Sequence, residues 1–436
     1  MNTLQKILKI LLENRGRFVS GTEIGRRLGI SRSAVSRNIT TLRERDLAVE
    51  SNPGQGHRLI ELPEGLHPDI LQLKINGITS DLELKYREQV ESTNTLLKQI
   101  ASRQAEAGCS TGQDILLLAE EQTAGRGRRN RSWDSPPGQG LYFSLLLHPD
   151  ISPDRAPLLT GLTSLALERS LYRHGFPVQL KWPNDLLLAG RKVAGILAEV
   201  STDMDQVSHV IIGVGLNTTR TSFPRELENQ ATSLKKYLQQ QPENYDTTEQ
   251  AREKSQGTSQ RASRENSKKQ PDDITEESSE STPEEVLEEI SGEISEEISN
   301  ETTEKTSIKR PIESSIKKPL EKFIEKPIEK LTEKPLESTG EASQKTPLEI
   351  PEEEILLDFL REFYQLLDLF TTDREAEVIA DWKASLQIIG EKIAISTGNR
   401  EIRGKVRDIS PRGEIVLQTE KGEEQRFWAG DVTVIN

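Results

Sequence analysis

Apolar side chains recur at helical spacing in the first part of the chain and are interrupted by turn residues. Residues 4–12 (LQKILKILL) predict one helix. A second helix is expected to start after the capping residue Ser20 and to end at Leu28, where Gly29 supplies a turn. Ser31 then caps a third helix, whose buried stripe falls at Ala34, Val35, Ile39 and Leu42. Two short helices around a glycine turn predict a helix-turn-helix, from about Gly21 to Thr40.

The polar positions around this motif favour contact with DNA. After the third helix, LAVES and HRLI read as two short strands around the turn NPGQG, which is typical of a β-wing. An ordinary three-helix bundle with a hydrophilic face is the alternative. We expect the basic side chains to neutralise phosphates and the polar face of the third helix to meet base edges in the major groove. The candidate DNA-binding residues are Arg32, Ser33, Ser36, Arg37 and Asn38.

Beyond residue 63 the pattern changes to a larger mixed fold. Residues 67–241 alternate strand-like apolar runs with helical stretches, which predicts a mixed α/β domain with its own core. Residues 351–387 add the last helices of this domain. Residues 388–436 alternate apolar and polar positions between glycine-rich turns, as in a small SH3-like antiparallel barrel of about five strands. The expected class is therefore α+β or mixed α/β, with a winged helix-turn-helix over residues 1–63.

Residues 242–350 form a low-complexity insert. The segment is rich in Glu, Ser, Thr, Lys and Pro, and it carries 16 basic against 27 acidic residues. An eight-residue repeat places proline at 311, 319, 327 and 335, which would interrupt any long helix. So few apolar residues cannot offset the entropy of ordering the chain, and we expect a disordered insert without a catalytic role.

Composition restricts the functional classes. The net charge of −14 argues against a nucleic-acid partner, but residues 1–60 carry 11 basic against 5 acidic residues, so the charge must be judged by segment. Cys109 is the single cysteine, which excludes an internal disulfide, and the scattered histidines suggest no metal site. No apolar run approaches the roughly 20 residues of a membrane span. We therefore expect a cytoplasmic protein that does not engage a membrane.

The stretch EEQTAGRGRRNRSW at 120–133 carries the strongest chemical signal. It follows the strand-like run DILLLAEEQ, its glycines let backbone amides approach an anion, and its arginines neutralise that anion. The spacing matches neither a P-loop nor a dinucleotide fingerprint. RNA binding and a solvated charge run are the alternatives when the stretch is taken alone. Asn130 stands at the position of the third glycine of the dinucleotide fingerprint, and asparagine tolerates a positive φ.

Three other motifs accompany this loop. Ser92, Thr93 and Asn94 either cap a helix or bind a ligand. Lys181 precedes a tight Trp-Pro-Asn turn, where a lysine either stabilises charge on a transferring group or forms a surface ion pair. The runs KVAGILAE and IIGVGLN place glycine within strands, for packing or for close approach of a ligand.

In this order the motifs resemble the biotin–protein ligases of the bifunctional type that also represses the biotin operon. The resemblance covers residues 1–240 and resumes at about 352. It implies that biotin attacks ATP to give biotinyl-adenylate, and that the acyl group passes to a lysine of a biotin carboxyl carrier protein. Mg²⁺ would accompany ATP, held mainly by phosphate oxygens.

The resemblance also implies roles for individual residues. Lys181, Arg126 and Arg128 would be catalytic. Biotin would be held by Ser92, Thr93, Asn94, Gln122, Arg126, Gly127, Arg128 and Lys181. The adenylate and ATP would be held by Gly125, Arg129, Arg131, Trp133, Asn184, Asn217 and Arg407, with residues 230–233 near the adenine. A mobile loop would shield the mixed anhydride from water.

The implied partners are the carrier protein, operator DNA of biotin genes, and a second copy of the chain once biotinyl-adenylate is bound. Three alternatives stay open at this point. The first is a ligase whose N-terminal domain no longer regulates, and the second is a lipoate–protein ligase. The third is a transcription factor that senses biotin without catalysis, although mere sensing would not require Lys181 and the arginine loop.

Overall fold

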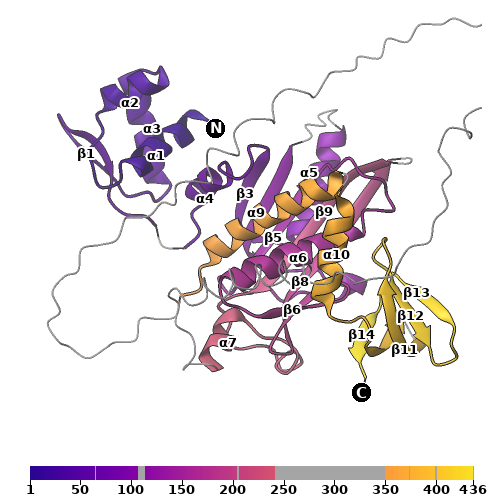
Figure 1. Cartoon of the computed structure of the whole chain (residues 1–436). Helices are drawn as coiled ribbons and strands as arrows, with labels where there is room; N and C mark the ends of the chain where they lie inside the picture. Colours follow the sequence, from indigo (N-terminus) through magenta and orange to yellow (C-terminus); the bar gives the residue numbers. More distant parts are fainter. Residues whose placement is uncertain are drawn as a thin grey trace, which may run out of the picture. The chain divides into compact units, whose positions relative to one another are not determined.

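A computed structural model describes residues 1–63, 65–106, 113–203, 206–240, 349–372, 374–397 and 400–435 (Figure 1). All but the last two residues of the predicted insert lie outside these ranges, and so does Cys109. Within the ranges, no helix is both long and apolar enough to cross a bilayer.

The N-terminal segment forms the predicted winged helix-turn-helix. Ser20 and Ser31 cap the second and third helices by accepting the amides of Glu23 and Ala34, and Gly29 ends the second helix with a φ of 67°. The predicted stripe of the third helix is buried, except that Ala34 is half-buried. The elements are α1 (Thr3–Glu13), α2 (Gly21–Leu28), α3 (Arg32–Glu44), and the antiparallel pair β1 (Val49–Asn52) and β2 (Gly56–Leu59).

The face of α3 away from this core is open. Arg32, Ser33, Ser36 and Arg37 are exposed, and Asn38 is half-buried because its Nδ2 donates to the carbonyl oxygen of Ala34 at 2.8 Å. Four of the five candidate DNA-binding side chains are therefore accessible to solvent. The helix α4 (Pro68–Ile75) follows the wing.

A seven-stranded mixed sheet forms the centre of the larger domain. Its order is β3-β4-β5-β9-β8-β7-β6, in which β3 and β4 are parallel and the other neighbours are antiparallel. The strands are β3 (Leu82–Val90), β4 (Asp114–Gln122), β5 (Gly140–Leu147), β6 (Val178–Lys181), β7 (Asp185–Leu188), β8 (Arg191–Asp203) and β9 (Gln206–Asn217). The run QLKWPNDLLL is thus a hairpin, turning at a cis Trp182–Pro183 bond.

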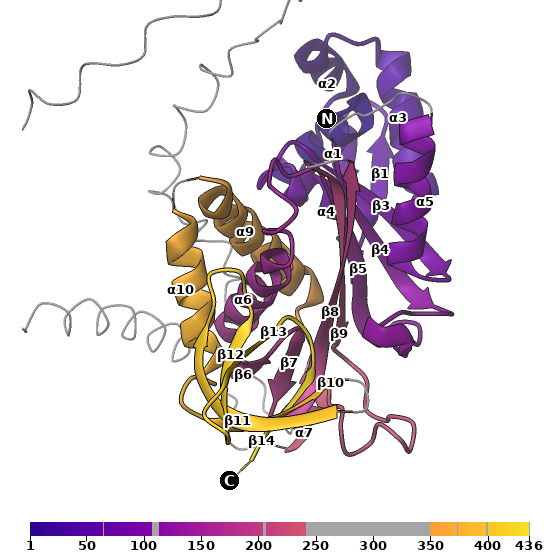
Figure 2. The same ribbon diagram turned by 90° about the vertical axis from the view of Figure 1, so that its right-hand side faces the viewer.

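Helices cover both faces of this sheet. One helix packs on Ile115, Leu117 and Ile211, while three others close the main core on the opposite face (Figure 2). The first is α5 (Thr93–Glu106), and the three are α6 (Leu158–Arg173), α9 (Glu352–Thr371) and α10 (Glu375–Leu386). Two short elements, the 3₁₀ turn η1 (Arg128–Asn130) and α7 (Leu234–Gln240), lie beside strand ends.

The C-terminal segment is a five-stranded antiparallel sheet, as expected in number. Its order is β13-β12-β11-β10-β14, and no pairing joins β13 to β14 among the described residues. The strands are β10 (Lys392–Thr397), β11 (Arg400–Ile409), β12 (Ile415–Thr419), β13 (Glu424–Phe427) and β14 (Asp431–Val434). Trp182 Nε1 donates to the carbonyl oxygen of Gly413 at 3.1 Å, which fixes the β6–β7 hairpin against this sheet.

Glu168 is a buried carboxyl group on α6 that makes the stability of the fold depend on pH. Burial raises the pKa of Glu168 to about 7, partly offset by a hydrogen bond with Ser385. Because the folded pKa lies above the unfolded value, the folded state binds the extra proton and loses stability as the pH rises from about 4.5 through 7. Glu168→Gln should therefore stabilise the protein by about 2 kcal/mol at pH 8 and by little at pH 5. Urea unfolding at both pH values tests this, with the exposed Glu228→Gln as control. An equal gain at both pH values would contradict it.

Candidate active site

A cavity of about 710 Å³ opens where the central sheet meets the C-terminal sheet. It falls within the size range of small-molecule sites. Its walls come from the β3–α5 turn, the arginine loop after β4, the β6–β7 hairpin, β8, β9, the segment after β9, and the start of β14 with the preceding Gly430. Seven cationic side chains line it against three acidic ones, namely Arg126, Arg128, Arg129, Arg131, Lys181, Lys192 and Arg220 against Asp134, Asp185 and Asp431. Such an excess of positive charge suits an anionic ligand.

The arginine loop folds back on itself. The amide of Gly127 donates to the carbonyl oxygen of Arg131 at 2.7 Å, and the amide of Trp133 donates to that of Gly125 at 2.8 Å. A Cβ on Gly125 would lie 2.3 Å from the carbonyl oxygen of Trp133, so this position requires glycine. Asn130 has a φ of 59°, which confirms the predicted tolerance, and Arg129 shares that backbone conformation at 53°.

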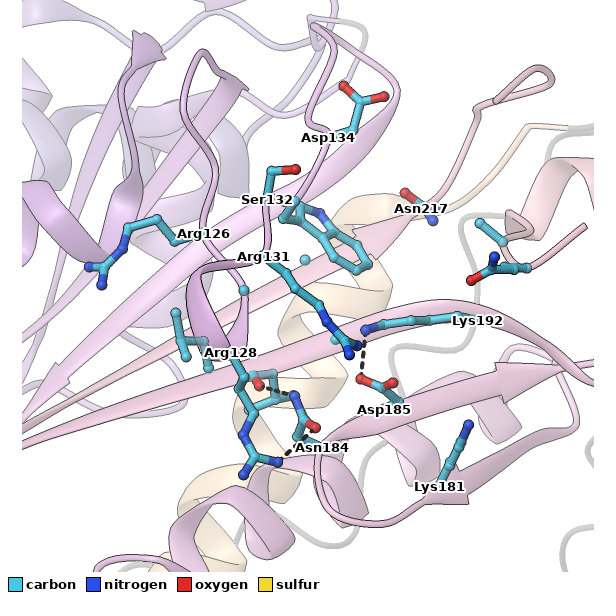
Figure 3. A pocket seen from close by; sticks show the side chains of 18 of the residues that line it. Arg126, Arg128, Arg131, Ser132, Asp134, Lys181, Asn184, Asp185, Lys192 and Asn217 are labelled. Carbon is cyan, nitrogen blue, oxygen red and sulfur yellow. Dashed lines mark hydrogen bonds and ion pairs between the residues drawn. The ribbon is translucent and has the colours of Figure 1, made fainter. Parts of the chain in front are cut away.

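The arginine loop carries four arginines, of which Arg126, Arg128 and Arg131 point in different directions in Figure 3. Arg126 leaves the main cluster and pairs with Glu199 of β8 at 3.1 Å. Arg128 donates to Asn184 Oδ1 at 3.2 Å, and burial together with the neighbouring charge of Arg129 lowers its pKa. The other two approach Asp431 of β14, Arg131 at 2.5 Å and Arg129 at 3.7 Å.

The motif Ser92-Thr93-Asn94 forms a wall of the cavity on the side of Gln122 and Glu199. Both the amide and the hydroxyl of Thr93 donate to Gln122 Oε1, at 2.9 and 3.1 Å. Asn94 Nδ2 donates to Glu199 Oε2 at 3.0 Å, which connects this motif to Arg126 through one carboxylate. The three residues are buried at the start of α5, so they serve both as a helix start and as a cavity wall.

Side chains that line the cavity fill the space beside two glycines of β9. A Cβ on Gly213 would lie 2.1 Å from Asn94 Oδ1, and one on Gly215 would lie 2.3 Å from Trp133 Nε1. Trp133 Nε1 is buried and has no hydrogen-bond partner among the described residues. The absence of side chains at these glycines therefore makes room for Asn94 and Trp133, so their role is the packing of two residues of the candidate site.

Two lysines flank one carboxylate in the β6–β7–β8 region. Lys181 lies opposite Asp185 in the hairpin, and Lys192 Nζ pairs with Asp185 Oδ1 at 2.7 Å. Lys192 also lies 5.2 Å from the centre of the Trp133 ring, a cation–π contact. Sequence reasoning selected Lys181 and missed Lys192, although Lys192 opens the K-x-AGIL motif, three positions before the strand glycine Gly195.

The nucleotide end of the cavity differs from the prediction in its C-terminal contribution. Asn217 lines the cavity, as do Gln230 and Ala231 of the predicted 230–233 region. Arg407, in contrast, is an exposed residue of β11 whose guanidinium bonds Gln418, and it is not among the lining residues. The C-terminal sheet instead contributes residues 430–433, which are Gly430 before β14 and the first three residues of β14.

Three family models match separate parts of the chain. Family models match at residues 86–217 (biotin/lipoate A/B protein ligase family), 3–58 (HTH domain) and 388–434 (biotin protein ligase C terminal domain). A biotin protein ligase from Aquifex aeolicus, solved in complex with biotin and ATP, aligns with 81% of this chain and 98% of its own at 20% identity and a TM-score of 0.46.

Two curated relatives are bifunctional ligase/repressor proteins named BirA. The one from Escherichia coli is 34% identical over 231 residues, which are 52% of this chain and 68% of the relative. The one from Bacillus spizizenii is 38% identical over 237 residues, which are 53% of this chain and 71% of the relative. With this identity over more than two thirds of both relatives, the chain belongs to the bifunctional ligase/repressor BirA family of biotin–protein ligases.

Proposed function

We propose that the cavity catalyses the activation of biotin by ATP to biotinyl-5'-AMP and the transfer of biotin to a lysine of a biotin carboxyl carrier protein. The observation that carries this proposal is that one cavity joins two regions of different chemistry. A buried polar end around Asn94 suits the uncharged head of an acid, and a strongly cationic middle suits the carboxylate and the phosphates that react.

Bringing a carboxylate to the α-phosphorus of ATP places two anions together. A carboxylate oxygen forms the new bond to phosphorus while the bond to pyrophosphate breaks, and fixed cations stabilise the charge on both groups. Lys192, Lys181 and Arg128 supply cations in this part of the cavity. Arg128 also keeps its guanidinium oriented through Asn184, so little reorganisation is needed during the reaction.

The arginine loop supplies shielding as well as charge. Its contacts with Asp431 and Glu199 hold it across the cavity, where it would exclude water from the mixed anhydride. No group of three or more His, Cys, Asp or Glu side chains within the described ranges could hold a metal ion. Mg²⁺ would therefore arrive with ATP and be held by phosphate oxygens.

The repressor function rests on the exposed face of α3 and on pairing of two copies. A two-fold operator requires a dimer. Strand β7 covers β8 only as far as Gly195, so residues 197–203 of β8 have one edge without a strand neighbour among the described residues. A free strand edge is a template for pairing. Glu199 lies on this edge strand and contacts Asn94 and Arg126, which would link ligand occupancy to dimerisation.

A protein acting on operator DNA and a carrier protein would work in the cytoplasm.

A charged side chain on this edge is expected to prevent dimerisation. Val200 is exposed in the middle of the free edge, and Val200→Lys would bring two like charges together in a symmetric pair. With biotin and ATP present, sedimentation velocity should show a dimer for the wild type and a monomer for the variant. Tyr172→Lys, on the outer face of α6, should dimerise normally. A dimeric Val200→Lys variant would place the interface elsewhere.

The function itself is tested by biotin-dependent exchange of pyrophosphate into ATP, with lipoate as the control acid. Exchange with biotin alone supports the proposal and excludes the lipoate ligase. The absence of exchange with either acid would leave a non-catalytic sensor, whose cationic cavity would then need another ligand.

A further inference from the structure

Arg220 is a charged residue that is almost completely buried in the wall of the cavity. Only 7% of its side chain is exposed, whereas its partner Asp134 is 44% exposed. Its Nη2 donates to Asp134 Oδ2 at 2.6 Å and its Nε to the carbonyl oxygen of Ser222 at 2.7 Å. The guanidinium also stacks 4.5 Å from the centre of the Phe223 ring. A buried charge is costly unless it is paired, so this arginine requires Asp134 to stay in place.

The pair joins two segments that are distant in sequence. Asp134 is the exit of the arginine loop, and Arg220 lies just after β9, in the segment that lines the nucleotide end. Thr219 Oγ1 donates to the carbonyl oxygen of Gly138 at 2.9 Å, and the amide of Thr218 donates to that of Gln139 at 3.3 Å. The two segments are thus bonded along their length, and the Arg220 pair is the bond nearest the arginine loop.

Each segment carries a different part of the cavity. Asp134 directly follows Trp133, which covers Gly215 and carries Lys192 on its ring. The segment after β9 contributes Phe223 and Leu227 to the opposite wall. Whatever orders one of these walls therefore also restricts the other through the ion pair.

We infer that Arg220 is a positioning residue that orders the arginine-loop exit and the nucleotide wall as one unit, so that ATP strengthens the binding of biotin. This inference rests on the proposed function of the cavity. Its physical basis is the direct connection of the two walls: a ligand that fixes the position of one wall also fixes the other through the ion pair, so the two binding free energies are coupled. Without the ion pair each ligand would act only on its own wall.

The test compares biotin affinity with and without α,β-methylene-ATP, which cannot form the adenylate, by titration calorimetry. The wild type is expected to bind biotin at least about 5-fold more tightly with the analogue. Arg220→Met should reduce this ratio to nearly 1, while the affinity for biotin alone changes less than about 3-fold. Asp134→Asn, which keeps a side-chain oxygen as acceptor for Arg220 Nη2, should also lower the ratio, and circular dichroism of both variants establishes that they have folded.

Arg225→Met is the matched control. Arg225 is an exposed arginine of the same segment, and the structure shows no hydrogen bond or ion pair for it among the described residues. It should keep the wild-type ratio. A wild-type ratio in both Arg220→Met and Asp134→Asn, or a ratio of 1 in the wild type, overturns the inference while leaving the ligase proposal intact. Failure of the wild type to bind biotin at all overturns the proposed function instead.

Discussion

Replacement of Lys192 by alanine is expected to lower biotin-dependent pyrophosphate exchange by about 100- to 1000-fold, the range for removing one preorganised charge from a transition state. Lys192 is held by Asp185 at 2.7 Å and by the ring of Trp133, so its ammonium needs no reorientation before the reaction. The effect should appear in kcat, because negative charge develops on the leaving pyrophosphate as its bond to the α-phosphorus breaks.

Lys181→Ala is expected to lower adenylate formation by a similar factor, about 100- to 1000-fold, while leaving the fold intact. Lys181 lines the cavity and is the register partner of Asp185 in the hairpin, while Lys192 forms an ion pair with Asp185, so losing either lysine removes positive charge from this part of the cavity. Lys98→Ala, at an exposed position of α5 outside the cavity, is the control and should react normally. A wild-type rate in Lys192→Ala would restrict the role to Lys181, and a wild-type rate in both variants would remove the lysine mechanism.

The second large effect is expected from Gly215→Ala on β9. The added Cβ would lie 2.3 Å from Trp133 Nε1 and 2.4 Å from Cε2, so the indole must move away from its position against Gly215. Trp133 carries Lys192 and ends the arginine loop, and its displacement disturbs both. We expect a loss of about 100-fold in exchange activity, since small misplacements of positioned groups have effects of this size.

A double-mutant cycle separates this mechanism from general damage to the sheet. In a Trp133→Ala background the clash is absent, so adding Gly215→Ala should cost little further activity. Equal losses in the presence and absence of the indole would show that the glycine is needed for another reason. Circular dichroism of each variant establishes that the sheet has formed.

The helix-turn-helix was predictable because its signals are local. The caps Ser20 and Ser31 and the turn at Gly29 each act within one helical turn, and all three occur in the structure as expected. Strand order was not predictable in the same way. Placing β9 between β5 and β8 depends on pairings between distant segments, which no periodicity specifies.

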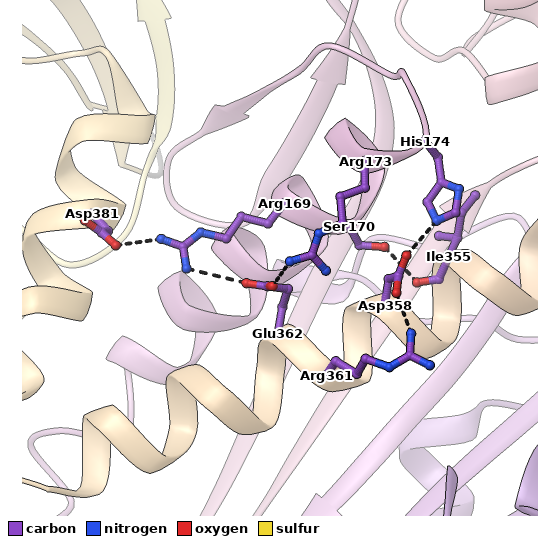
Figure 4. A network of polar contacts seen from close by, with 9 residues as sticks. All are labelled: Arg169, Ser170, Arg173, His174, Ile355, Asp358, Arg361, Glu362 and Asp381. Atoms are coloured by element: carbon purple, nitrogen blue, oxygen red, sulfur yellow. Dashed lines mark hydrogen bonds and ion pairs between the residues drawn. The ribbon is translucent and has the colours of Figure 1, made fainter. Parts of the chain in front are cut away.

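Burial of charge was equally hidden. The amphipathic pattern of residues 352–371 predicts helix α9, but it gives no sign that Glu362 is buried in the middle of that helix. Arg173 and Arg169 of α6 both reach its carboxylate, and Arg169 also pairs with Asp381 of α10 at 2.6 Å (Figure 4). Partners that compensate a buried charge come from other elements, so a pattern along one helix cannot reveal them.

The candidate site, too, was predictable where its residues form contiguous motifs and not where they come from distant segments. The contiguous motifs around Asn94, Arg128 and Lys181 were identified from the sequence and meet in one cavity. The residues that complete it, Asp431 and Arg220, belong to no such motif. Arg407 was selected from the C-terminal segment, but its side chain bonds Gln418 on the sheet, and only the register of five strands decides which residue of that segment reaches the cavity.

The ion pair between Arg131 and Asp431 spans 300 positions of the chain. The wall formed by residues 430–433 is made only when the last strand has been synthesised and has paired with β10. Contacts so distant in sequence require closure of a very long loop and tend to form late. A nascent or truncated chain ending before Gly430 would therefore carry every contiguous motif of the cavity and still lack one of its walls.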